Sequence, residues 1–137
     1  MRMMIVAILT LIISASSSEA RPRSHVRHFA TAGTIVAHPA GCPRTRFCGC
    51  GVARYIFGRI DGAMRPLWLA REWFRFPRAQ PAPGMVAVRR HHVFAIKENL
   101  GGGRVLAYNP NSGRRLTREH VMSLTGYRVV DPHGRGL

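Results

Sequence analysis

The clearest hydrophobic pattern in the chain runs from Arg46 to Ile60, with the sequence RFCGCGVARYIFGRI. At helical spacing, apolar side chains fall on two nearly opposite faces, Cys48, Val52, Tyr55 and Ile56 on one and Cys50, Ala53 and Phe57 on the other. This spacing predicts a short helix that carries Cys48 in its first turn, so that only one of the two cysteines can face a given partner.

The pattern further along predicts a second helix and then an antiparallel meander. Pro66 suits the first turn of a helix over 67–76, which Pro77 ends. Thr117 can cap a short helix over 118–124, which Gly126 stops. The predicted strands cover 85–97, as two runs that meet at Arg89 and Arg90, then 104–108 and 127–130. Helices followed by a meander indicate the α+β class.

Two polar residues end up on apolar faces of these predicted strands. Side chains alternate along a strand, so His92 shares a face with Phe94 and Ile96, and His91 points the other way. We therefore expect the side chain of His92 to point toward the core, on the face of the sheet that packs against the helix carrying Cys48. Asn109 ends the next strand, in line with two small apolar residues.

The beginning of the chain has the features of a secretory signal over residues 1–20. Arg2 is followed by an apolar run from Met3 to Ile13, and the small residues at 18–20 suit a cleavage site. The alternative is a membrane anchor, but the run is shorter than the ~20 residues that a spanning helix needs. Export also predicts an oxidising compartment, and a secreted or periplasmic protein without stable membrane insertion.

Removal of residues 1–20 leaves 137 − 20 = 117 residues, enough for one domain. Residues 21–40 are rich in Arg, His, Gly and Pro and predict a flexible basic leader. We expect the folded domain to cover 41–132, followed by a tail over 133–137.

The chain is strongly basic, with 21 Lys and Arg against 6 Asp and Glu and a net charge of +15. Lys97 is the only lysine, so the charge is almost entirely that of arginine. In an exported protein such a field attracts anionic wall polymers, lipid headgroups or polysaccharide, and we expect no specific nucleic-acid partner. A solvated, nonspecific surface charge explains the same composition.

Three cysteines in an exported protein cannot all pair within one molecule, so at least one of them is either a free thiol or forms a bridge to another molecule. A Cys42–Cys50 bridge would close a small loop and leave Cys48 free. A zinc site built from these cysteines and a histidine is the alternative, but the C-x5-C-x-C spacing fits no familiar ligand pattern well.

Cys48, His92 and Asn109 are together the parts of a cysteine hydrolase. A thiol at a helix start lies beside the positive end of the helix dipole, which lowers its pKa. A histidine can take the thiol proton, and a third polar group can orient the imidazole. Each residue also has a plain structural interpretation: a packed or disulfide-bonded cysteine, a core histidine, and an asparagine that forms a turn before proline.

The order and spacing of several short motifs resemble the CHAP-type and NlpC-type cysteine amidases and peptidases, which share a reduced papain-like fold. The motifs are Phe47-Cys48, Leu69–Trp73, Pro83-Gly84, His91-His92-Val93, Tyr108-Asn109 and Gly126-Tyr127-Arg128. The resemblance covers about residues 41–132. The chain departs from the pattern at C-G-C-G, where two glycines in the first turn of the helix each cost on the order of 1 kcal/mol against alanine.

The resemblance implies Cys48 as nucleophile, His92 as general base and Asn109 as the orienting group, with no cofactor and no metal. It also implies substrates with amide bonds, typically in the peptide part of peptidoglycan, and we expect a monomer. Two other functions remain open. One is a catalytically silent protein of this fold that binds anionic wall or surface polymers through its arginines, and the other is a small cationic toxin-like effector.

Overall fold

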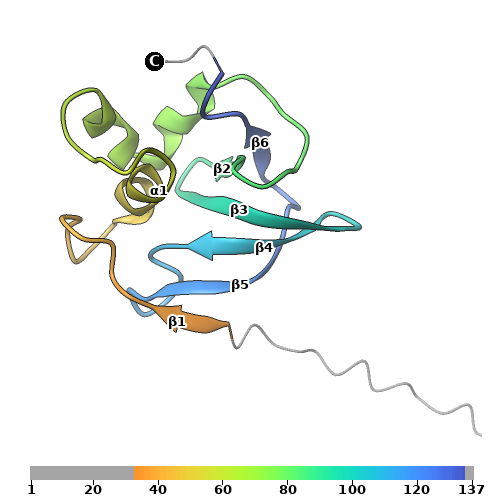
Figure 1. Cartoon of the computed structure of the whole chain (residues 1–137), viewed down its shortest axis with the longest axis horizontal. Coiled ribbons are helices and arrows are strands. Elements are labelled where there is room, and N and C mark those ends of the chain that lie inside the picture. The colour runs from red at the N-terminus through yellow and green to blue at the C-terminus, as the bar shows by residue number, and fades with distance from the viewer. Residues whose placement is uncertain (1–32, 135–137) are drawn as a thin grey trace, which may run out of the picture.

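The computed structural model describes residues 33–134, which form an α+β fold with a six-stranded antiparallel sheet (Figure 1). The helices are α1 (Cys48–Phe57) and the short 3-10 helices η1 (Gly62–Trp68) and η2 (Ala70–Arg75). The strands are β1 (Thr34–Val36), β2 (Val86–Arg89), β3 (His92–Gly101), β4 (Arg104–Asn109), β5 (Thr117–Ser123) and β6 (Arg128–Val130). Their order in the sheet is β1-β5-β4-β3-β2-β6. The predicted α+β class is therefore confirmed, whereas the predicted signal at 1–20 lies outside the described residues.

Helix α1 carries Cys48 in its first turn, as the hydrophobic spacing predicts, and ends at Phe57; Gly58, with a positive φ of 69°, is its C-cap. The two glycines of its first turn lie where another backbone or ring comes close. A Cβ at Gly49 would lie 2.2 Å from the carbonyl oxygen of Leu67, and one at Gly51 would lie 2.5 Å from Cβ of Pro110. The glycines therefore allow α1 to pack directly against η1 and the end of β4.

The single helix predicted over 67–76 is wrong, because the segment folds as η1 and η2 with an extended residue, Leu69, between them. Pro66 lies inside η1 and has no N–H to donate, which limits a regular helix there. Trp73 is fully buried, and its indole N–H donates to the carbonyl of Leu67 at 2.8 Å. The break thus places the largest core side chain against the sheet.

The two faces of the sheet belong to two different clusters. Helices α1, η1 and η2 cover the face that carries Val86, Val88, Val93, Ala95 and Val130. Phe94 and Ile96 of β3 point to the other face, where they pack with Ala87, Val105 and Ala107. The prediction that α1 faces His92, Phe94 and Ile96 is therefore wrong: α1 packs on the opposite side of β3. Hydrophobicity alone could not choose between the faces, because both are apolar.

The short helix predicted over 118–124 is also wrong, because this segment is strand β5. It pairs along all six residues of β4, from Arg104 with Ser123 to Asn109 with Arg118. On its other side β5 pairs with β1, where Thr34 lies opposite Glu119. Hydrogen bonds to two neighbouring strands override the local helix preference.

Strand β1 corrects the predicted boundary of the domain. Thr34–Val36 were expected in the flexible leader, yet they form an edge of the sheet, so the fold includes residues before Gly41. The connection from β5 to β6 leads from one side of the sheet to the other, and Leu124 and Tyr127 pack on the face opposite the helices.

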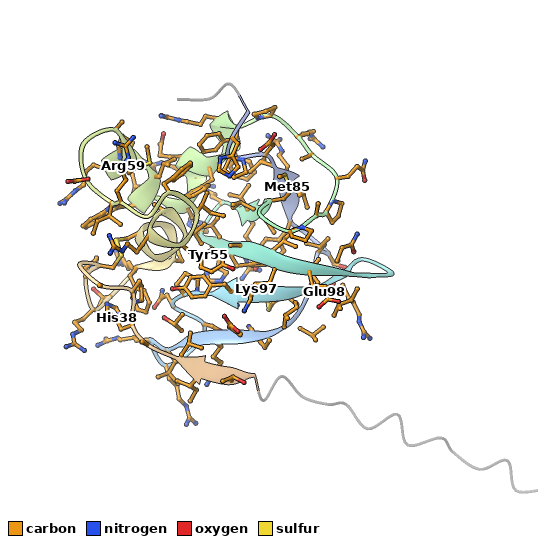
Figure 2. The ribbon with its side chains drawn as sticks, in the orientation of Figure 1. His38, Tyr55, Arg59, Met85, Lys97 and Glu98 are labelled. Atoms are coloured by element: carbon orange, nitrogen blue, oxygen red, sulfur yellow. A yellow bond between two sulfur atoms is a disulfide. The ribbon has the colours of Figure 1, made fainter. Side chains whose placement is uncertain are left out.

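Tyr55 of α1 lies over the sheet near Lys97 of β3 (Figure 2). Its ring stacks on that of Tyr108 of β4, with centroids 4.3 Å apart. The stack holds the middle of α1 against β4. None of the helices within residues 33–134 is long and apolar enough to cross a membrane.

Candidate functional site

Cys48 is the free cysteine among the described residues, because Cys42 and Cys50 form a disulfide with their Cα atoms 5.8 Å apart. The structure thus decides a pairing that the sequence left open, and neither bridged sulfur can serve as a zinc thiolate. Within residues 33–134 there is no group of three or more His, Cys, Asp or Glu side chains that could hold a metal ion.

Cys48 is the first residue of α1 and is 6% exposed, at the wall of a cleft of about 450 Å³. Backbone N–H groups of Gly49, Val93 and Cys48 itself face the sulfur. Burial raises the pKa of the thiol, and these N–H groups lower it by less. The prediction of a lowered pKa is therefore wrong for the resting protein, because desolvation outweighs the end of the helix.

His92 and Asn109 are joined as the sequence order suggests. Nε2 of the half-buried His92 lies 2.7 Å from Oδ1 of Asn109, whose side chain is 2% exposed. Burial lowers the pKa of His92, the bond to Asn109 raises it, and Arg89 and His120 lower it further. The imidazole is therefore neutral near pH 7, which is the form that a general base needs.

Two contacts bring α1 to the same end of the sheet as this pair. The N–H of Val93 faces the sulfur of Cys48, and Val93 directly follows His92. A strand N–H lies roughly in the plane of its sheet, so the sulfur lies near the level of the sheet where β3 begins. Gly51 packs on Pro110, the residue after Asn109.

The cleft beside Cys48 adjoins a second one of about 260 Å³ that His92 and Asn109 line. Asn111 lines both clefts. Tyr127 lines the second cleft; burial raises its pKa, Arg89 lowers it, and the Cys48 sulfur is close enough to raise it further. The three predicted residues thus gather around one end of β3 and β4, although α1 covers the opposite face of the sheet.

Within the described part of the chain, no hydrogen bond joins the sulfur of Cys48 to His92. The bond to Asn109 occupies Nε2 of His92 and leaves Nδ1 without a hydrogen-bond partner among the same residues. His91, which the alternation placed on the other side of the strand, is exposed and lines the cleft with Cys48. It is the competing candidate for the base.

The sequence interpretation missed His120 of β5, whose Nε2 lies 2.9 Å from Nδ2 of Asn109. His120 is 8% exposed and lies in the segment that was expected to be a helix. If the segment had been interpreted as a strand, alternation would have put His120 and Met122 on one face, and this pattern could have identified His120 as a candidate.

Three arginines, Arg46, Arg71 and Arg90, line the Cys48 cleft, and no carboxylate of residues 33–134 lines it. Arg46, two residues before Cys48, has a positive φ of 53°, an unusual conformation for a side chain of this size. The cleft therefore has a positive wall.

His38 lies in the segment that was expected to be a flexible leader, but it is half-buried. Its Nε2–H donates to the carbonyl of Cys42 at 3.1 Å, and its ring meets Phe47 edge-on with centroids 4.4 Å apart. These contacts hold the segment before α1 in place, next to the nucleophile candidate.

Comparison of the chain with protein families, with curated proteins and with solved structures finds no match.

Proposed function

We propose that the protein is an exported cysteine hydrolase with a reduced papain-like fold of the CHAP type, which cleaves amide bonds in cell-wall peptide. The observation that supports this most is the 2.7 Å bond between His92 and Asn109, at the strand ends where the Cys48 sulfur meets the N–H of Val93. A nucleophile, a base and an orienting amide are then present in the chain order Cys, His, Asn.

In the proposed reaction, the Cys48 thiol gives its proton to Nδ1 of His92 as sulfur attacks the carbonyl carbon. The imidazolium returns the proton to the leaving nitrogen, the C–N bond breaks, and a thioester forms. His92 then deprotonates a water molecule, which releases the acid and restores the thiol. Asn109 keeps the other imidazole proton on Nε2 throughout.

The first turn of α1 supplies donors for the developing oxyanion. The first N–H groups of a helix have no partner within it, and no side chain of residues 33–134 caps this turn. These N–H groups lie beside the attacking sulfur, and therefore close to the carbonyl oxygen of the substrate, on which negative charge develops during the attack. The raised pKa of the resting thiol fits a nucleophile that ionises only as it passes its proton to His92.

The substrate and location follow from charge and export. Peptidoglycan peptide carries carboxylates, which suit the arginines of the cleft wall. The disulfide suits a secreted or periplasmic protein, and we take the monomer as the acting form. The reaction needs neither cofactor nor metal ion.

A second candidate is a catalytically silent protein of this fold that binds anionic wall polymers. The buried Cys48 thiol with its raised pKa favours this candidate. So do the arginines, because the ion pairs within residues 33–134 involve only Arg71, Arg75 and Lys97.

Purified cell walls separate the two functions. The wild type should release free amino groups from the walls, and Cys48→Ala should release them at least about 10³-fold more slowly, because the nucleophile is absent. Both proteins should still sediment with the walls at low salt. Sedimentation of both without any release of amino groups would contradict the hydrolase and favour the silent binder.

A further inference from the structure

Asn109 lies between two histidines in a buried chain of hydrogen bonds. Its Oδ1 meets Nε2 of His92 at 2.7 Å, and its Nδ2 meets Nε2 of His120 at 2.9 Å. Asn109 and His120 are 2% and 8% exposed, so water does not compete freely for these bonds. These hydrogen bonds link three adjacent strands, β3, β4 and β5.

The chemistry of an amide makes the two ends of this chain depend on each other. Oδ1 only accepts and Nδ2 only donates. Met122 fixes which end is which, because its sulfur, an acceptor without a proton, lies 3.5 Å from Nδ2. His120 must then accept through Nε2, and His92 must donate through Nε2. The Ser112 hydroxyl, 3.4 Å from Nε2 of His120, can donate to the same lone pair.

We propose that His120 is a positioning residue that holds Asn109 in one orientation and thereby keeps His92 in the tautomer whose Nδ1 can accept the Cys48 proton. This inference rests on the proposed function for its meaning, but the tautomers can be measured without a substrate. His120 touches neither sulfur nor substrate and acts through Asn109.

The position of His120 leaves one of its ring nitrogens buried without a hydrogen-bond partner among the described residues, which is unfavourable for stability. When Nε2 of His120 accepts, the proton of the neutral ring lies on Nδ1, and Nδ1 of His120 is buried without a hydrogen-bond partner among the described residues. The opposite tautomer would leave the same atom unpartnered and would also place two donors, Nε2–H and the amide N–H, against each other. The chain of donors therefore selects one tautomer at each histidine.

Protonation of His120 should break its hydrogen bond to Asn109, because a proton on Nε2 removes the lone pair that accepts from the amide. The amide would then turn around and present Nδ2 to His92, which forces the wrong tautomer there. The charged and titratable groups near His120 are Arg118 on its own strand, Arg89 and Tyr127 at the shared cleft, and His92 across Asn109. Burial, and after it the charge of Arg118, lowers the pKa of His120. The hydrogen bonds that join His92, Asn109 and His120 therefore stay intact at neutral pH.

Long-range ¹H–¹⁵N NMR correlations of the full-length chain report the tautomer of each histidine. In the wild type at pH 7.5, His92 should carry its proton on Nε2 and His120 on Nδ1. His120→Gln keeps a carbonyl acceptor for Asn109 but cannot titrate, so His92 should keep its tautomer to lower pH than in the wild type. His120→Leu removes the acceptor, so His92 should become a mixture of tautomers and Cys48 should react severalfold more slowly with iodoacetamide.

His133→Gln is the control, because this histidine is exposed and lies outside both clefts. A wild-type His92 protonated on Nδ1 would overturn the proposal, as would a folded His120→Leu variant with an unchanged His92. If His120→Leu does not fold, titration of the wild type decides, because the tautomer of His92 must change as His120 takes up its proton. Intact tautomers without hydrolysis of cell walls would count against the proposed function and leave this inference standing.

Discussion

The two faces of the sheet are both apolar in the middle but differ at the end where β3 begins and β4 stops. Within residues 33–134, the face under the helices is closed by Trp73 and Leu67 and has no buried hydrogen bond between two side chains. The opposite face changes from Phe94 and Ile96 to the linked His92, Asn109 and His120. The first face therefore holds the larger apolar cluster together with Cys48, whereas the second carries the histidines and the asparagine that are proposed to act on its thiol.

Trp73→Ala should have the largest effect on stability. It removes a fully buried indole and its bond to Leu67, which should lower the free energy of unfolding by about 3–5 kcal/mol. Urea denaturation measures the loss, and Leu69→Ala, at a residue 52% exposed, is the control with a much smaller effect. A Trp73→Ala variant as stable as the control would mean that the helices contribute little to the core.

Gly51→Ala tests the contact that joins α1 to the polar end of the sheet. The added Cβ would lie 2.5 Å from Cβ of Pro110, which should cost about 1–3 kcal/mol and move Cys48 away from Asn109 and His92. We expect slower alkylation of Cys48 together with the lost stability. Gly58→Ala strains the positive φ at the other end of α1 without any such contact, so it should reduce stability and leave alkylation unchanged. Equal alkylation rates in both variants would contradict the proposed link.

Acid should destabilise the protein by a smaller amount, through the polar end of the sheet. The pKa values of His92 and His120 are lowered in the folded protein, so their contribution is complete above the ordinary value of about 6.5 and is lost as the pH falls below it. The free energy of unfolding should drop by on the order of 1 kcal/mol between pH 7 and pH 5.5. His120→Gln should show a shallower drop, and a stability that rises over this range would rule out the assigned directions.

Local pattern was enough to predict some parts of this molecule. The spacing of apolar residues predicted α1 with Cys48 in its first turn, and alternation put His92 in line with Phe94 and Asn109 in line with Val105. The close spacing of the cysteines made a Cys42–Cys50 bridge possible, and the structure contains it. In each of these cases the residues that decide the structure lie within about ten positions of one another.

The remaining parts depend on segments that are distant in the sequence. Thr34–Val36 is a strand because β5 lies beside it, and β5 is a strand because β4 does. Which apolar face of β3 receives α1 depends on Gly49, Gly51 and the bulk of Trp73, all outside the strand. His120 stayed hidden for the same reason, since its bond to Asn109 exists only after β5 pairs with β4.

The rate at which iodoacetamide alkylates Cys48, followed from pH 5 to 10, tests most directly whether Cys48 and His92 act as a pair. If His92 accepts the thiol proton, alkylation should persist at neutral pH and fall on the order of tenfold or more in His92→Ala, with a lesser change in His91→Ala and none in His133→Ala. A buried thiol acting alone would instead react only above the ordinary cysteine pKa of about 8.5, equally in the wild type and in His92→Ala. That second result would contradict the catalytic assignment of Cys48 and His92.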